Sequence, residues 1–187
     1  MKTYGMFDDF VKEKDFDEET IEKYKGKIPN FMTKLWKKYG MGSFFRGYFR
    51  MINPEEYQEI VDNTYDSPAE TIIPLFVTSF GDIITWEDEE YLCILLYRYG
   101  RMGCITTEDD DWFDWMSDSD DKDFRQFTLK KHREALEKYG QPAFDECYGY
   151  VPILALGGSE KVENIKKVKT KEHIYLINQF EGNIQDK

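Results

Sequence analysis

The middle of the chain consists of apolar runs separated by short polar turns. The runs are rich in β-branched and aromatic side chains, and they cover residues 72–80, 83–86, 91–99 and 104–107. Gly81-Asp82 separates the first two runs, and the acids at 88–90 separate the second from the third. Apolar runs of this length between turn residues are typical of paired strands. We therefore expect an antiparallel meander in the middle of the chain.

Before this meander, apolar residues recur at helical spacing. Phe7, Phe10 and Val11 share one helical face, which predicts a first short helix. Asp17 is a good N-cap for a second helix, and Gly26 follows the end of that helix. Acids in its first turn suit the positive end of the helix dipole.

Two further helices are expected before the strands. The first starts at Pro29 and ends at Gly40, a residue type that is common just after a helix. The second starts at Asn53-Pro54, and its predicted buried positions are 57, 60 and 61. Between these two helices, residues 42–53 are aromatic and follow no regular period.

After the meander, three more helices are expected. Residues 127–139 follow helical spacing, and Ser159 is a suitable N-cap for a helix that reaches Val168. Thr170 is a suitable cap for the last helix. The apolar face of that helix is predicted to carry His173, Leu176, Ile177 and Phe180. Helices at both ends of an antiparallel sheet define an α+β fold.

Residues 145–158 form the longest nearly uncharged run of the chain. Gly157-Gly158 end the run, and Pro152 lies inside it, where it lacks the N–H that a central strand donates. Such a run predicts a strand buried on both faces or a tightly packed loop. We expect the rest of the chain to pack around it, with Leu154 and Leu156 buried.

Composition and charge restrict the class of protein. The chain has 187 residues, of which 41% are apolar, and this length suits one compact domain with a substantial core. No apolar run is long enough to span a membrane, and the first residues lack the apolar centre of a signal peptide. These features predict a cytoplasmic protein. The net charge of −12 argues against direct nucleic-acid binding and favours a basic partner or simple solubility.

The chain has three cysteines, which is an odd number without metal-ligand spacing. Cys93 and Cys104 each lie in an apolar stretch and are expected to be buried thiols, and Cys147 lies in the uncharged run. A disulfide between two of the three remains an alternative, which a reducing compartment disfavours.

The segment from Glu108 to Asp123 contains nine acids, one lysine and several aromatic residues. Tryptophan within an acidic rim is a composition typical of protein-binding hot spots. The predicted partner-binding residues are Glu108, Asp109, Asp110, Asp111, Trp112, Trp115, Asp118, Asp120 and Asp121. The alternative is a surface loop whose aromatic residues pack back onto the core.

Metal sites and catalytic sites find little support in the sequence. Asp118 and Asp120 match the first two ligand positions of a calcium loop, but Lys122 occupies the third and no glycine follows. No nucleophile elbow, phosphate-binding loop or zinc-protease motif is present. His132 has no acid or cysteine at a catalytic spacing, so we expect a surface or half-buried histidine. No cofactor is expected.

Two stretches of the chain resemble a known family. The C-terminal stretch contains the run Tyr148–Gly158 and, further on, Glu172–Leu176 followed by Gln179. The N-terminal stretch contains, in the expected order, Phe7 to Val11, Ile28-Pro29, Leu35-Trp36, Tyr39-Gly40, Gly47 and Asn53-Pro54. In these residues the chain resembles the GAD-like immunity proteins associated with type VI secretion DNase toxins.

The resemblance implies one domain over residues 1–187, with 1–107 as the GAD-like part and 108–187 as the C-terminal part. It implies an immunity protein, or antitoxin, that binds a cognate toxin and blocks its active site, without a cofactor. The implied partner is a toxin, often a nuclease, and the net charge of −12 independently favours a basic toxin domain rather than nucleic acid or a membrane.

Two other functions remain open from the sequence. The first is a non-catalytic regulatory or scaffold module for another cellular protein, which would lack a toxin gene directly upstream. The second is a hydrolase in which acids near Asp110 hold Mg²⁺. The net charge of −12 argues against the hydrolase, because a nuclease needs a basic surface for its substrate.

Overall fold

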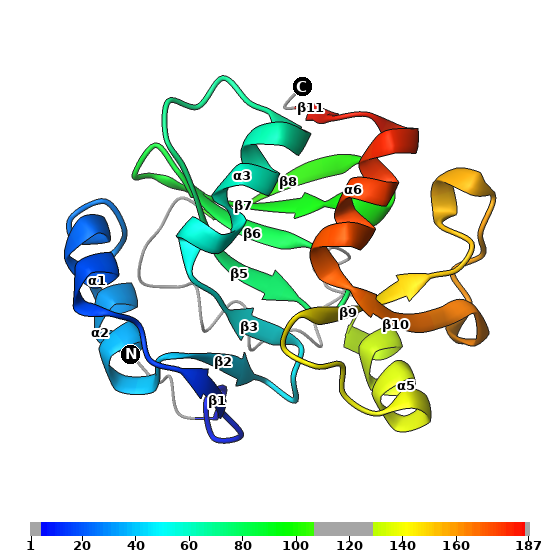
Figure 1. Cartoon of the computed structure of the whole chain (residues 1–187), viewed down its shortest axis with the longest axis horizontal. Coiled ribbons are helices and arrows are strands. Elements are labelled where there is room, and N and C mark those ends of the chain that lie inside the picture. The colour runs from blue at the N-terminus through cyan, green and yellow to red at the C-terminus, as the bar shows by residue number, and fades with distance from the viewer. Residues whose placement is uncertain (1–4, 107–128, 186–187) are drawn as a thin grey trace.

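The structure is a computed structural model, and it describes residues 5–106 and 129–185 (Figure 1). A seven-stranded antiparallel sheet, ordered β1-β2-β3-β5-β6-β7-β8, forms its centre. Its strands are β1 Val11–Lys14, β2 Met41–Phe44, β3 Phe49–Met51, β5 Ile72–Thr78, β6 Ile83–Glu87, β7 Tyr91–Leu96 and β8 Arg101–Thr106. The strands β5 to β8 are consecutive both along the chain and in the sheet, so the predicted meander is confirmed.

Helices lie on the sheet and at its ends. They are α1 Glu18–Tyr24, α2 Asn30–Tyr39, α3 Pro54–Thr64, α5 Leu129–Tyr139 and α6 Thr170–Glu181. Short 3₁₀ turns are η1 Tyr97–Tyr99, η2 Leu154–Leu156 and η3 Val162–Asn164. In Figure 1, α3 and α6 lie in front of the sheet, whereas α1 and α2 lie beside its β1–β3 end. The α+β class predicted from the sequence is therefore correct.

Two pairs of short strands complete the fold. One pair is antiparallel and joins β9 Glu146–Tyr150 to β10 Ile165–Lys169. The other is parallel and joins β4 Tyr65–Asp66 to β11 Ile184–Gln185, which brings the end of the described chain next to α3 (Figure 1).

Both faces of the central strands are buried. Ile84 and Ile94 belong to the apolar cluster that also contains Trp36 of α2. Their strand neighbours Ile83 and Leu95 belong to the second cluster, under α3 and α6. Successive strand residues point to opposite faces, so strands covered on both sides are apolar throughout rather than alternating.

The predicted side-chain caps of α1 and α3 are confirmed, whereas the cap predicted for the last helix is wrong: Lys169 is the N-cap of α6 without a side-chain hydrogen bond, and Thr170 is the first helical residue. The Asp17 side chain accepts a hydrogen bond of 2.7 Å from the backbone N–H of Thr20 and caps α1. The Asn53 side chain caps α3 in the same way, with Pro54 at the first helical position. Gly40 ends α2 with φ 77°, and a Cβ there would lie 2.5 Å from the Lys14 carbonyl oxygen. Glycine is therefore required by both conformation and space at this position.

The first short helix predicted from Phe7, Phe10 and Val11 is wrong. Phe7 and Phe10 lie in and just after a turn, and Val11 begins β1, where it pairs with Ser43 of β2. The Phe7 ring is buried and stacks on Phe44 at 4.6 Å between centroids. The partner strand, 30 residues away in the chain, supplies hydrogen bonds that a spacing pattern does not reveal.

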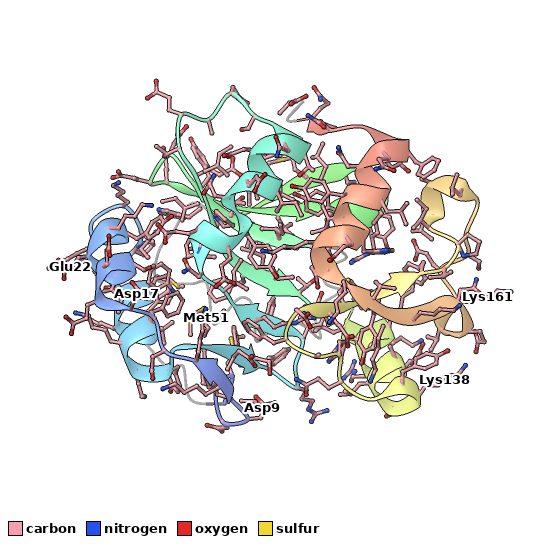
Figure 2. The ribbon with its side chains drawn as sticks, viewed as in Figure 1. Asp9, Asp17, Glu22, Met51, Lys138 and Lys161 are labelled. Carbon is pink, nitrogen blue, oxygen red and sulfur yellow. The ribbon has the colours of Figure 1, made fainter. Side chains whose placement is uncertain are left out.

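The aromatic stretch 42–53, for which no regular structure was expected, forms the β2–β3 hairpin. Phe45 and Arg46 have φ of 53° and 55°, which is unusual for residues other than glycine. The Asp9 carboxylate accepts hydrogen bonds from the backbone N–H groups of both residues, at 2.9 Å in the case of Phe45. Asp9 therefore stabilises the turn from the N-terminal side (Figure 2).

The helix predicted from Ser159 to Val168 is also wrong. Val162 lies in the short turn η3, and Ile165 begins β10, which pairs with Tyr150 of β9. Ile165 is buried while Lys166 and Lys167 are exposed. A spacing of three apolar positions is compatible with a helix, but strand pairing with β9 satisfies the backbone instead.

The uncharged run 145–158 is only partly the buried centre that its composition suggested. Its first half forms β9, in which Cys147 and Tyr148 are buried, and the peptide bond before Pro152 is cis. Leu154 is half-buried, whereas Leu156 is 56% exposed. The burial expected for Leu156 is therefore wrong, because the 3₁₀ turn η2 directs it away from the core.

Candidate interaction surface

The predicted binding segment lies outside the described residues. Glu108, Asp109, Asp110, Asp111, Trp112, Trp115, Asp118, Asp120 and Asp121 all fall between 107 and 128. The described chain stops at the end of β8, an edge strand of the sheet, and resumes at α5. The structure therefore describes the elements on either side of this segment, β8 and α5, and their contacts.

The C-terminal part is held on the sheet by polar contacts with β3, β5 and the turns that follow them. The Arg50 side chain, 2% exposed, donates from Nη1 to the Phe144 carbonyl oxygen at 2.9 Å. The backbone N–H of Tyr148 donates to the Ser79 carbonyl oxygen at 2.7 Å. Gly81 comes so close to Cys147 that a Cβ would lie 3.1 Å from its sulfur. These contacts explain the glycine and the small thiol at the junction.

His132 of α5 is buried rather than on the surface or half-buried as expected. Its Nδ1 lies 2.9 Å from the Ser79 hydroxyl oxygen, and its Nε2 lies 3.1 Å from the Arg46 carbonyl oxygen. Since a carbonyl only accepts, Nε2 carries the proton, and the neutral ring accepts from Ser79. Burial is the main reason that the pKa of His132 falls to about 4. This histidine therefore joins α5 to the sheet as a neutral ring.

A buried ion pair lies beneath the C-terminal part. The carboxylate of Asp82 accepts a hydrogen bond from Arg98 of η1, and the two side chains are 0% and 4% exposed. The Arg98 guanidinium also lies over the rings of Phe80 and Tyr99, at 4.9 and 4.8 Å. Burial raises the pKa of Asp82, while Arg98 and Thr78 oppose the rise. Such a pair is costly to break because neither charge reaches water.

The cavity beside Arg98 is too small for a substrate. It measures about 10 Å³, which is enough for one water molecule, and Tyr150, His173 and Ile177 are among its lining residues. The carboxylate of Asp82 and the ring of His173 are 0% and 7% exposed. Within residues 5–106 and 129–185, no three His, Cys, Asp or Glu side chains are placed to hold a metal ion. Asp82, Arg98 and His173 therefore belong to the packed interior beneath the C-terminal part.

Exposed apolar side chains concentrate on α6 and η2. Leu156 of η2 and Leu176 and Phe180 of α6 are 56%, 43% and 53% exposed. These two elements are neighbours, since Ala155 lines the same small cavity as Ile177. We call these three residues the α6–η2 apolar surface. Leu176 and Phe180 are four residues apart and therefore share one face of the helix.

The sequence placed Leu176 and Phe180 on the buried face of the last helix, and this was wrong. The buried face carries His173, Ile174 and Ile177 instead. On another side of the helix, Lys171 donates to the Glu56 carbonyl oxygen and lies 4.6 Å from the centroid of the Tyr57 ring. These contacts orient α6 towards α3, which leaves Leu176 and Phe180 uncovered by the described residues.

Exposed ion pairs lie elsewhere on the surface of the described chain. Lys138 of α5 contacts Glu163 at 3.5 Å, and Lys169 contacts Asp145 at 2.6 Å. Figure 2 shows Lys138 and Lys161 at the outer edge of the C-terminal part, at the opposite end of the molecule from Asp17 and Glu22. Exposed pairs of this kind contribute little to stability. They surround the helices with solvated charge, in contrast to the α6–η2 apolar surface.

None of the helices in the described ranges is both long and apolar enough to cross a membrane.

Comparison with known proteins identifies two family models along the chain. The GAD-like domain matches residues 2–97, just over half of the chain, and the C-terminal domain of the T6SS immunity protein Tdi1 matches residues 107–181. No curated protein matches the chain. A solved structure described as the crystal structure of Atu4351 from Agrobacterium tumefaciens is 21% identical, with a TM-score of 0.72, over 92% of this chain and 86% of that one. That likeness supports the fold, and the two family matches show that the chain belongs to the GAD-like immunity proteins of type VI secretion.

Proposed function

We propose that this immunity protein binds a basic nuclease toxin and blocks its active site through the segment Glu108–Asp123. The observation that carries this proposal is the concentration of acidic residues in this one segment. That segment contains nine acids and one lysine, within a chain whose net charge is −12. It also lies inside the range matched by the Tdi1 immunity domain.

The proposed mechanism follows from the chemistry of nucleases. A nuclease active site lies in a groove whose basic side chains bind phosphates. A dense row of carboxylates is attracted to that groove and competes with the phosphates of DNA. Opposite charges also raise the association rate by about ten- to a thousandfold, which favours capture of the toxin in a crowded cell. No catalytic step and no cofactor is needed, and a nuclease target places the encounter in the cytoplasm.

We propose that tryptophan side chains in the same segment slow the dissociation of the bound toxin. Trp112 and Trp115 lie among the acids, and large rings that fill a pocket on a partner account for much of the energy of typical interfaces. The α6–η2 apolar surface adds exposed Leu156, Leu176 and Phe180 within the same family range, 107–181. We propose that the toxin covers this surface as well.

Binding kinetics with purified toxin test the two contributions separately. Asp109→Lys combined with Asp111→Lys should slow association and weaken its dependence on salt, because exposed charges act by steering. Trp112→Ala or Trp115→Ala should speed dissociation, with a loss of about 2 kcal/mol or more in binding free energy. The binding partner in this test is the product of the gene directly upstream, and the kinetics are measured at two salt concentrations.

A folding check and a control variant are needed to interpret the binding kinetics. Each variant must first melt as the parent does, since either tryptophan can instead belong to the core. Lys161→Ala, on the exposed outer edge of the C-terminal part, is the control that should bind as the parent. Parent-like kinetics for folded variants of both kinds would place the interface elsewhere. Binding without inhibition of DNA cleavage would refute the blocking mechanism and retain the immunity role.

The regulatory or scaffold function is the second candidate for the same surface. It is favoured if no toxin gene neighbours this gene and if co-expression with candidate toxins does not rescue growth. Both functions use the chain as a protein-binding module without catalysis.

We also propose that residues 1–187 form one domain, with 1–107 as the GAD-like part and 108–187 as the C-terminal part. The supporting contacts are those of Arg50 with Phe144 and of Ser79 with His132 and Tyr148, which join the two parts through buried groups. Expression of residues 1–107 alone should therefore give a chain that is less stable and prone to aggregate.

A further inference from the structure

Two cysteines face each other across the last pair of strands in the sheet. Cys93 of β7 is the register partner of Cys104 of β8 in an antiparallel ladder. Directly opposed residues of such a ladder point to the same face, with Cα atoms about 4.5–5.5 Å apart. This separation lies inside the range of roughly 4.4–6.8 Å that disulfides occupy. The register of the two strands is therefore compatible with a disulfide between Cys93 and Cys104.

The pair is accessible from solvent on one side. Cys93 is 3% exposed, as the sequence suggested, but Cys104 is exposed rather than buried. Both cysteines line a surface groove of about 340 Å³, together with Tyr91, Met102 and Pro68. A small disulfide-containing molecule therefore has room to reach Cys104, and Cys93 is its register partner on the neighbouring strand.

The third cysteine has a different environment. Cys147 is completely buried at the junction with the C-terminal part, and burial raises the pKa of its thiol to about 11. A buried thiol that stays protonated is inert in exchange reactions. The structure thus separates one opposed pair, Cys93 and Cys104, from Cys147, which lies alone at the buried junction.

Other uses of the pair find no support. A metal site would need further ligands, and no group of three suitable side chains occurs in the ranges that the structure describes. If both thiols served only to fill the core, Cys104 would be covered, whereas it is exposed on the edge strand.

We propose that Cys93 and Cys104 form a reversible disulfide when the protein meets an oxidised low-molecular-weight thiol such as oxidised glutathione. The Cys104 thiolate attacks one sulfur of the reagent, forms a mixed disulfide and releases the first small thiol. Cys93 then loses its proton, attacks the Cys104 sulfur and expels the second small thiol. Two protein thiols are oxidised to one disulfide, and one reagent disulfide is reduced to two thiols.

The disulfide fastens the edge strand to the sheet. The bond closes the short loop from β7 through η1 and Gly100 into β8, so β8 can no longer separate from β7 at this point. Edge strands open more readily than central ones, because they have a partner on one side only. β8 is also the last described element before the acidic segment, so the bond would restrain the base of that segment. This inference does not depend on the nature of the toxin.

The test uses the full chain, first reduced and then incubated with oxidised glutathione. The expected product has lost two hydrogens, carries no bound glutathione, and yields a peptide in which Cys93 and Cys104 are linked. Dithiothreitol should restore the starting mass. Hydrogen exchange at the backbone N–H groups of β8 should slow in the oxidised form and recover on reduction.

Single variants separate the two steps. Cys93→Ser should stop the reaction at a glutathione adduct on Cys104, and Cys104→Ser should leave the chain unmodified. Cys147→Ser is the matched control, and it should still form the disulfide if it folds. Retention of glutathione by the folded parent, or a linkage that involves Cys147, would overturn the proposal. Failure of the folded parent to react would overturn it as well.

Discussion

The buried ion pair between Asp82 and Arg98 permits a quantitative test of how the fold is stabilised. Both side chains are inaccessible, at 0% and 4% exposure, so water does not screen the interaction. The Asp82 carboxylate also accepts a hydrogen bond of 3.2 Å from the Thr78 hydroxyl, while its Oδ1 finds no partner among the described residues. Removing Arg98 would therefore leave a buried carboxylate supported by one neutral hydroxyl.

We expect Arg98→Met to lower the free energy of unfolding by about 3–5 kcal/mol, as loss of one partner from a buried pair does. For a chain of this length that corresponds to a fall in Tm of roughly 6–20 °C. Methionine retains most of the apolar contact with Phe80, so the loss of stability comes mainly from the missing positive charge of Arg98.

The loss should depend on pH in a definite direction. In the variant, burial without a counter-charge holds the pKa of folded Asp82 above that of the unfolded chain. The folded state then binds a proton more readily, which favours folding at low pH. The deficit relative to the parent should therefore shrink as the pH falls towards the unfolded pKa, and it should be fully present above the raised folded pKa.

The assay is urea unfolding followed by fluorescence of the buried residues Trp36 and Trp86, at neutral and acid pH. Asp82→Asn combined with Arg98→Met is the matched double variant, and it should recover part of the loss because no charge remains buried. An Arg98→Met variant that unfolds within about 1 kcal/mol of the parent would refute the reasoning. A deficit that is the same at both pH values would refute it too.

Three further predictions follow from the described contacts. Burial lowers the pKa of His132 to about 4 from an unfolded value near 6.5, so the parent should lose about 3 kcal/mol as the pH falls through that window, and His132→Gln should flatten this part of the unfolding profile. Ile177→Ala should cost about 2–5 kcal/mol, whereas Leu156→Ala should change stability by less than about 0.5 kcal/mol in the same urea titration; equal losses would show that η2 packs differently. Calorimetric titration with Ca²⁺, Mg²⁺ or Zn²⁺ should show no micromolar one-to-one isotherm, because Lys122 breaks the calcium spacing.

Features with local causes could be predicted from the sequence. Asp17 and Asn53 cap α1 and α3 because the oxygen acceptor and the N–H donors are only two or three residues apart. The strands β5 to β7 were predictable because an apolar run that is too short for a helix, between turn residues, has few other solutions. Their hairpin connections follow from the same turn signals.

Features that depend on distant partners could not be predicted. Val11 and Ile165 begin strands only because β2 and β9 offer unpaired backbone groups beside them. The pairing of Cys93 with Cys104 depends on the register of β7 against β8, and a shift of one residue would place them on opposite faces. A pattern along one segment contains no information about such registers.

The candidate binding region divides in the same way. The density of acids between Glu108 and Asp123 is a property of the sequence, because the net charge of a segment depends on its residues and not on its conformation. The exposure of Leu176 and Phe180 is a property of the tertiary structure. Their helical spacing allows a buried face as readily as an exposed one, and the contacts of Lys171 with α3 and of Ile177 with the core determine which side of α6 faces solvent.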